Sequence, residues 1–324
     1  MAPAPEVGAR VKKRWLFPLG LLCIFLPGLG AHAATYYVTI SGLGGEPDYE
    51  QRFAGLAGDL EKLLKDSGGD LRVHTLSGKD ASRAHINEIF ATLAHEAKAE
   101  DDLVVILIGH GSFDGNEYKF NIPGPDISGA ELASLCDKIA AKRQLIVNTT
   151  SASGGSVAAL KKSGRAIITA TKSGTEKNAT VFARYWIEAL RDPAADVDKN
   201  ESISALEAFQ YAERKTTEFY ESQKRLATEH PQFEDTGKSD PVRAPSSEGN
   251  EGLLLSTITL VRIGQAQRAA NDPAKRDLLA KKEELEQKID KLKYEKAAMP
   301  EDEYKRQLTG TLVELARVQQ ELDK

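Results

Sequence analysis

Cysteine is scarce in this 324-residue chain, which has only two, and aromatic residues make up just 6% of it. Cys23 lies in an N-terminal apolar stretch that we expect to be removed, so Cys136 is left as the single cysteine. One cysteine cannot form an intramolecular disulfide. Because Cys136 falls on the apolar face of a predicted helix, we interpret it as a buried structural thiol.

The chain also lacks an excess of positive charge. It has 43 Lys and Arg residues against 48 Asp and Glu residues, a formal net charge of −5. Without residues 1–33, the count becomes 39 basic and 47 acidic residues, a net charge of −8. Nothing in this balance indicates nucleic acid or an anionic membrane surface as a partner.

Long hydrophobic runs are confined to the N-terminus. A basic segment (residues 10–14) precedes an apolar run (residues 15–29) and the small-residue sequence Ala31-His32-Ala33. This order is typical of an export signal that is cleaved, over residues 1–33. The apolar run is short and contains prolines, so a retained membrane anchor is the less favoured alternative. We expect a mature chain from Ala34 that is periplasmic or secreted, in the manner of a bacterial envelope protein.

Between residues 35 and 190, short apolar segments alternate with segments in which apolar residues recur at helical spacing. The predicted strands cover residues 36–40, 71–76, 103–108, 144–147 and 165–170. Apolar residues at helical spacing lie between them. This alternation predicts an α/β fold with a mainly parallel sheet of about six strands and helices on both faces.

Polar residues follow two of these strands at the point where each strand ends. His110 comes after the buried strand 103–108, and a Thr/Ser/Gly loop containing Ser151 comes after strand 144–147. A helix between two parallel strands brings their carboxyl ends to the same edge of the sheet. Ligands of open α/β sheets bind at that edge, so we predict the functional site there.

The two motifs resemble a known family. A strand ending in His110-Gly111, then a hairpin, a helix and a strand ending in Ser151-Ala152-Ser153-Gly154, is similar to the caspase and legumain group of cysteine peptidases. The similarity covers residues 35–228. It implies a caspase-like three-layer sandwich with His110 as general base and the N–H groups of Gly111 and Ser151 as oxyanion hole. Ser151 stands where the family has its nucleophilic cysteine.

The serine leaves three functions open. A hydroxyl needs a well-oriented base, usually held by an acid, and Asp114 is the only acid close to His110 in sequence. The first interpretation is an inactive or weakly active peptidase-like protein that binds peptides or partner proteins. The second is a serine-type peptidase or hydrolase with a Ser151-His110 dyad. The third is a calcium-stabilised scaffold of the cell envelope.

Residues 196–207 have the spacing of an EF-hand-like calcium loop. Such a loop supplies oxygen ligands from positions 1, 3, 5, 7, 9 and 12, because calcium takes six to eight oxygens. Those positions hold Asp196, Asp198, Asn200, Ser202 through its carbonyl, Ser204 and Glu207. Glu201 occupies position six, where glycine normally provides a positive φ. The pattern predicts a calcium site, with a polar connection between two helices as the alternative.

The C-terminal third differs in composition. Residues 230–252 are rich in Pro, Gly, Ser and charge, and residues 231–270 are predicted as a linker, in which residues 253–263 could add a strand. Residues 271–324 are charged, with apolar stripes interrupted at Met299-Pro300. They predict an antiparallel, coiled-coil-like helical hairpin. Its stripes need a partner, which could be the hairpin itself, the core domain or a second copy of the chain.

Overall fold

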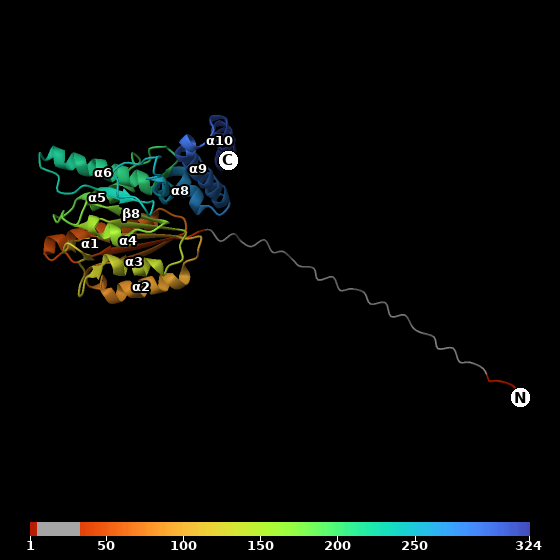
Figure 1. The fold of residues 1–324 in the computed structure, drawn as a ribbon, viewed down its shortest axis with the longest axis horizontal. Helices are drawn as coiled ribbons and strands as arrows, with labels where there is room; N and C mark the ends of the chain where they lie inside the picture. Colours follow the sequence, from red (N-terminus) through yellow and green to blue (C-terminus); the bar gives the residue numbers. More distant parts are fainter. Residues whose placement is uncertain (5–32) are drawn as a thin grey trace. The chain divides into compact units, whose positions relative to one another are not determined.

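The computed structural model describes residues 1–4 and 33–324. Residues 33–324 form one compact unit (Figure 1). Nearly all of the predicted export signal, residues 1–33, lies outside the described residues. None of the helices in the described part is both long and apolar enough to span a membrane.

A six-stranded sheet runs through the centre of this unit, in the order β10-β8-β7-β3-β1-β2. Five of its strands are parallel, and the edge strand β10 is antiparallel to β8. The strands are β1 (Thr35–Ser41), β2 (Leu71–Leu76), β3 (Asp102–Ile108), β7 (Arg143–Asn148), β8 (Arg165–Thr169) and β10 (Gln232–Glu234). The predicted α/β fold with a mainly parallel sheet is confirmed.

The central strand β3 is apolar throughout because both of its faces are covered. All seven of its residues are buried. Val104, Ile106 and Ile108 point into one hydrophobic core. Leu103 and its alternate neighbours point into the other core. An unbroken apolar run therefore separates two helical layers.

Helices cover both faces of the sheet (Figure 1). The first core is lined by α1 (Pro47–Asp66), α5 (Phe182–Ala189) and α6 (Ala205–Ser222). The second is lined by α2 (Arg83–Glu96), α3 (Gly129–Asp137) and α4 (Val157–Leu160). Cys136 is fully buried in α3, and burial raises the pKa of its thiol to about 12, as suits a structural thiol.

A small second sheet follows His110. It is made of β4 (Gly111–Phe113), β5 (Tyr118–Phe120) and β6 (Ile127–Ser128), all antiparallel. The β4–β5 turn contains Asp114, whose carboxylate accepts the backbone N–H groups of Asn116 and Glu117 at 2.9 and 2.8 Å. Short 3-10 helices also occur at η1 (Gly78–Asp80), η2 (Ser153–Ser156) and η3 (Lys296–Ala298).

The segment predicted as a linker, residues 231–270, is built into the fold. It contributes β10 to the main sheet and then forms α7 (Leu253–Thr257), β11 (Thr259–Arg262) and α8 (Gly264–Asn271). The strand suggested over residues 253–263 is thus limited to β11, which pairs with β9 (Ser202–Ser204). Residues 253–257 are helical because the buried Asp235 carboxylate accepts the N–H groups of Gly252 and Leu255 at the start of α7.

The C-terminal helices α9 (Arg276–Glu295) and α10 (Glu301–Leu322) lie against each other, as the interrupted stripe predicts. The pair is part of the same compact unit as the sheet. Lys282 of α9 donates to the Asn200 carbonyl at 2.7 Å, and Glu283 forms a two-point ion pair with Arg262 of β11. Leu312 and Val313 of α10 stay exposed, and self-association through these helices remains a prediction.

Candidate functional site

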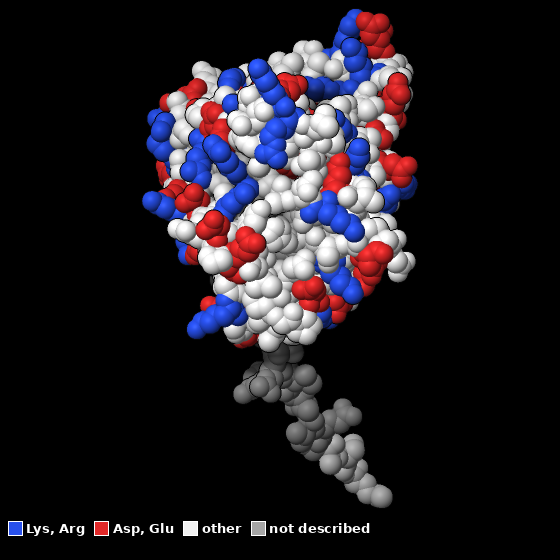
Figure 2. All heavy atoms as spheres, turned by 90° about the vertical axis from the view of Figure 1, so that its left-hand side faces the viewer, with Lys and Arg blue, Asp and Glu red and all other residues white. Residues whose placement is uncertain are grey.

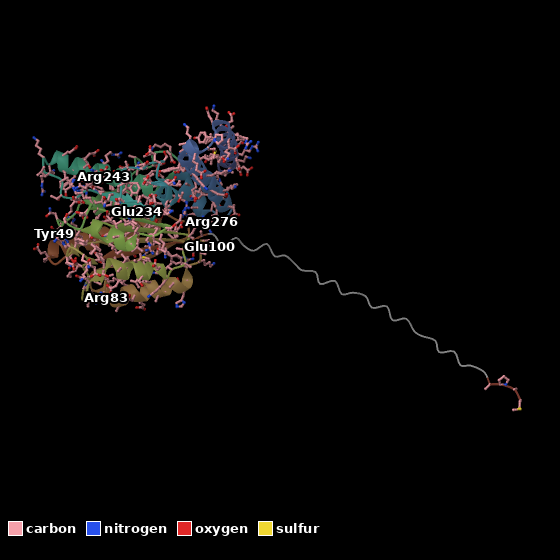
Figure 3. The ribbon with its side chains drawn as sticks, viewed as in Figure 1. Tyr49, Arg83, Glu100, Glu234, Arg243 and Arg276 are labelled. Atoms are coloured by element: carbon pink, nitrogen blue, oxygen red, sulfur yellow. The ribbon has the colours of Figure 1, made fainter. Side chains whose placement is uncertain are left out.

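The ends of β3 and β7 define the candidate site. These strands are paired in parallel with Leu107 opposite Asn148, so His110 and Ser151 leave the same edge of the sheet, as predicted. The α1 residue Tyr49 lies beside this edge and marks it at the left of Figure 3. Figure 2 views that side and shows a broad uncharged band with Lys, Arg, Asp and Glu on either side of it.

His110 contacts aromatic side chains of α1. Its ring lies edge-on to Tyr49 and Phe53, with centroid distances of 4.8 and 5.1 Å. Burial lowers the pKa of His110, and the nearby positive charge of Arg52 lowers it further. The imidazole is thereby favoured in its neutral form, which a general base requires.

The Ser151 hydroxyl is hydrogen-bonded to the backbone of Gly111. Its Oγ donates to the carbonyl of Gly111 at 2.9 Å and accepts the N–H of the same residue at 3.1 Å. The residue is only 3% exposed. Among the hydrogen bonds of residues 33–324, none joins the His110 ring to the Ser151 hydroxyl. The Gly111 N–H that the family resemblance assigns to an oxyanion hole is occupied by the hydroxyl itself.

The loop around Ser151 is held by its neighbours. Ala152 adopts a left-handed conformation with φ of 55°, and its N–H donates to the Glu176 carbonyl at 2.7 Å. The N–H of Gly154 donates to Thr171 Oγ1 at 2.9 Å. A Cβ at Gly154 would come within 2.3 Å of the Ser173 nitrogen. Residues 151–155 and 171–176 therefore form one tightly bonded wall of the site.

Three acids near this edge, of which the sequence suggests only Asp114, have their carboxylates engaged by groups other than His110. Asp114, the only nearby acid in sequence, has its carboxylate engaged by its own turn, and those backbone bonds lower its pKa. Glu176 Oε1 lies 2.5 Å from His230 Nδ1. Glu229 accepts the N–H groups at the start of α5, and burial raises its pKa to about 7. Nothing in the sequence pattern singles out Glu176, Glu229 or His230, because their partners are distant in the chain.

The predicted calcium loop brings its acidic residues together. Oxygens of Asp196, Asp198 and Glu207 lie within 4.8 Å of one another. The Asp196 carboxylate accepts the N–H groups of Asn200 and Glu201, each at 3.2 Å. Glu201 has φ of 66°, so position six takes the left-handed conformation although it is not glycine.

Helix α9 adds further acids over this loop. A cavity of about 30 Å³ is lined by the loop and by Glu283, Glu286 and Asp290 of α9. Partial burial, reinforced by the Glu207 carboxylate, raises the pKa of Asp198 to about 6. Burial raises the pKa of Glu286 to about 7. The donors around the cavity are oxygens, and this chemistry fits calcium or another hard divalent cation.

Comparisons with known proteins find similar folds, but no related sequence. No protein-family model and no curated protein matches the chain. Among solved structures, it is similar to protein GSU0716 from Geobacter sulfurreducens (12% identity, TM-score 0.45, covering 64% of this chain and 94% of that one). It is also similar to the Drosophila initiator caspase Dronc (10% identity, TM-score 0.40, covering 68% of this chain and 84% of that one). A third similar structure is caspase-1 from Spodoptera frugiperda (14% identity, TM-score 0.43, covering 63% of this chain and 87% of that one). What this chain has in common with these caspases is the fold alone.

Proposed function

We propose that this chain is an exported, caspase-like binding protein with little or no peptidase activity, which holds an extended peptide or protein segment at the carboxyl edge of its sheet. The observation that carries the proposal is the pair of hydrogen bonds between Ser151 and Gly111. A nucleophilic hydroxyl must give its proton to a base. Here the hydroxyl donates a hydrogen bond to a backbone carbonyl and accepts the Gly111 N–H, so neither the hydroxyl nor that N–H is free for acyl transfer.

The surface at this edge supports binding of a peptide. The uncharged band of Figure 2 offers an extended segment a place to bind without burying unpaired charges. Tyr49 adds a half-buried aromatic ring at one side, and Lys172 adds an exposed side chain from the loop after β8. Aromatic side chains supply much of the contact area in peptide recognition.

The test separates binding from hydrolysis. The mature chain, residues 34–324, is treated with a fluorophosphonate probe and, separately, screened against an array of extended peptides. We expect no labelling of Ser151. We also expect a set of bound peptides that is lost in the Tyr49→Ala and Lys172→Trp variants and retained in Lys293→Ala, a change on α9. Labelling that vanishes in Ser151→Ala would establish the serine hydrolase instead. Peptides retained by all the variants would contradict peptide binding at this edge of the sheet.

Convergence of the Asp196, Asp198 and Glu207 oxygens favours a second role, calcium-dependent stabilisation. A cation that binds only the native state must raise its stability. We expect millimolar calcium to raise the melting temperature of the mature chain, and we expect Asp198→Ala to abolish the rise. The exposed acid Asp59 of α1 provides the matched control, because Asp59→Ala should leave the calcium effect unchanged. An equal calcium shift in Asp198→Ala would mean that the loop is only a connector.

A further inference from the structure

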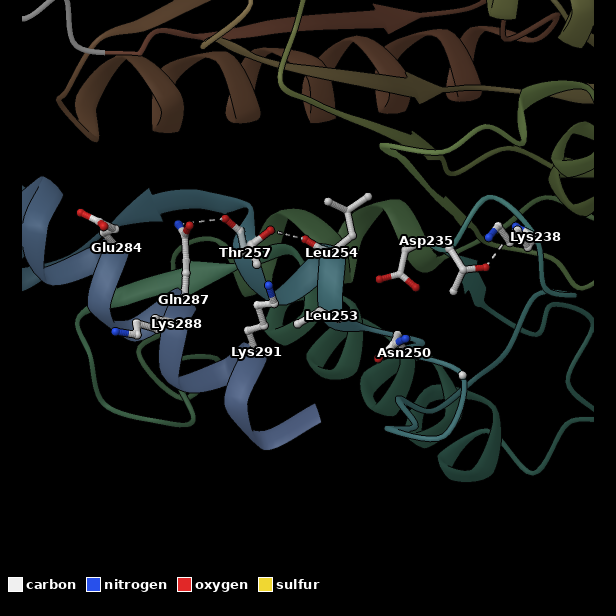
Figure 4. Close-up of a pocket in the computed structure, with 12 residues that line it drawn as sticks. Asp235, Lys238, Asn250, Leu253, Leu254, Thr257, Glu284, Gln287, Lys288 and Lys291 are labelled. Atoms are coloured by element: carbon white, nitrogen blue, oxygen red, sulfur yellow. Dashed lines mark hydrogen bonds between the residues drawn. The ribbon is translucent and has the colours of Figure 1, made fainter. Parts of the chain in front are cut away.

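A groove separate from the sheet edge lies between helix α9 and the segment that leads into α7. Its volume is about 690 Å³, within the range of ligand-binding clefts. Leu253 and Leu254 of α7 line it, and α9 lines it with Gln287 and two lysines. Figure 4 shows the α9 side chains along one part of the groove and the residues from 235 to 254 along the rest.

The charges of this groove do not balance internally. Asp235 is buried, and its carboxylate is used by the backbone N–H groups of Gly252 and Leu255. Glu284 is paired with Lys281 at 3.2 Å. Among the cations, Lys291 has a 3.6 Å ion pair with Glu295. Lys238 and Lys288 also line the groove, and neither forms an ion pair with any residue of the described range 33–324.

Two polar groups inside the groove are satisfied by the protein. Gln287 donates to the Thr257 carbonyl, and the Thr257 hydroxyl donates to the Leu254 carbonyl. The groups left for a ligand are mainly leucine side chains and lysine ammonium groups, beside the Glu284 carboxylate that pairs with Lys281. The lysines are spread along the groove, with Lys238 at one end and Lys288 near the other (Figure 4). Separated cations suit a ligand with several separated negative charges better than one with a single carboxylate.

We infer that this groove binds an extended acidic peptide segment of a partner protein, with an apolar side chain on Leu253 and carboxylates on Lys238 and Lys288. Three lysines line the groove against two acids, Asp235 and Glu284, so the groove has a formal excess of one positive charge on a chain whose net charge is −5. Such a local contrast steers oppositely charged partners and sets which partners are accepted. The inference does not depend on the sheet edge, because it uses none of the residues of the proposed peptide site there.

The test uses a fluorescent peptide in which glutamates alternate with leucines, and the same peptide with every glutamate replaced by glutamine. Binding to the mature chain is followed by fluorescence anisotropy at low and moderate salt. We expect saturable binding of the acidic peptide, at least about tenfold tighter than that of the neutral one, and weaker binding as salt screens the charges. The Lys238→Glu/Lys288→Glu variant should weaken binding of the acidic peptide by at least about tenfold.

A matched variant separates the groove from general electrostatics. Lys293→Glu/Lys305→Glu changes the net charge by the same amount at two exposed lysines that do not line the groove. It should retain most of the affinity, while Leu253→Ser should reduce binding of both peptides. Equal binding of the neutral peptide, equal loss in the control variant, or no saturable binding of the acidic peptide would each overturn the inference.

Discussion

Replacing Ser151 with alanine should destabilise the protein. The opposite is expected if Ser151 is a catalytic nucleophile. Active-site residues are often held in arrangements that cost stability, so their removal is commonly neutral or stabilising. Ser151 instead satisfies the N–H and the carbonyl of Gly111, at 3.1 and 2.9 Å. The Ser151→Ala change removes both bonds without offering a replacement.

The size of the effect follows from those two bonds. A typical intramolecular hydrogen bond contributes about 0.5–1.5 kcal/mol net, so losing two costs about 1–3 kcal/mol. Gly111 is only partly buried, and water can reach part of its backbone, which places the estimate toward the lower end. Cavity formation adds little, because a hydroxyl is the only group removed. We therefore expect a loss of about 1–2 kcal/mol in the free energy of unfolding.

Urea denaturation followed by circular dichroism measures this loss as a lower midpoint at unchanged slope. The control is Ser112→Ala, at the exposed neighbouring residue of β4, which should stay within about 0.5 kcal/mol of the parent. A Ser151→Ala protein as stable as the parent, or more stable, would refute the reasoning. It would mean that the Oγ is not committed to Gly111 and would restore the dyad with His110.

Further predictions concern the remaining titratable and reactive groups. Ser151→Cys is the single change expected to give detectable labelling by a thiol-directed peptide inhibitor, because a thiol ionises far more readily than a hydroxyl, and the label should be lost again in Ser151→Cys/His110→Ala. Glu229 has a pKa raised to about 7, against about 4.3 when unfolded, so the folded state binds its proton more tightly and stability should fall as pH rises through this range. Glu229→Gln should flatten that fall in denaturation curves at pH 5 and 8, and an unchanged pH dependence would count against the assignment. The calcium-induced rise in melting temperature should shrink below pH 6, because Asp198, with a pKa of about 6, is then protonated, and a rise that is equal at pH 5 and 7.5 would exclude Asp198 as a ligand.

Local patterns were sufficient for the sheet and for placing His110 and Ser151 at neighbouring strand ends. The apolar run of β3 and the small-residue loop after β7 identify two neighbouring strand ends, because a strand buried on both faces leaves a continuous hydrophobic signature. The helical hairpin was likewise visible from its interrupted stripe. What these signals share is that each is carried by residues close together in the chain.

The hydrogen-bond partners of the side chains at the site could not be predicted, because these partners are distant in the sequence. The bond partners Ser151 and Gly111 are 40 residues apart, and the acid near the start of α5, Glu229, is 47 residues from Phe182. The composition of residues 231–270 gave the same difficulty. Its polar residues look like a linker, yet Asp235 begins a helix by accepting N–H groups 17 and 20 residues away.

Glu201 shows how one such distant contact changes the meaning of a motif. A non-glycine residue in the left-handed region costs about 1–2 kcal/mol, so glutamate at position six is unfavourable when the loop is considered alone. In the structure, its carboxylate accepts the N–H groups of Gln265 and Ala266, each at 2.9 Å, at the start of α8. No side chain of the preceding residue caps that helix. A carboxylate at a helix N-terminus contributes about 0.3–1 kcal/mol through the dipole, and its charge-assisted bonds add to this. The strain is thus offset by a contact that glycine could not make. Because the adjacent Asn200 carbonyl also accepts a hydrogen bond from Lys282, the loop joins the sheet domain to the C-terminal helices, whether or not a cation binds there.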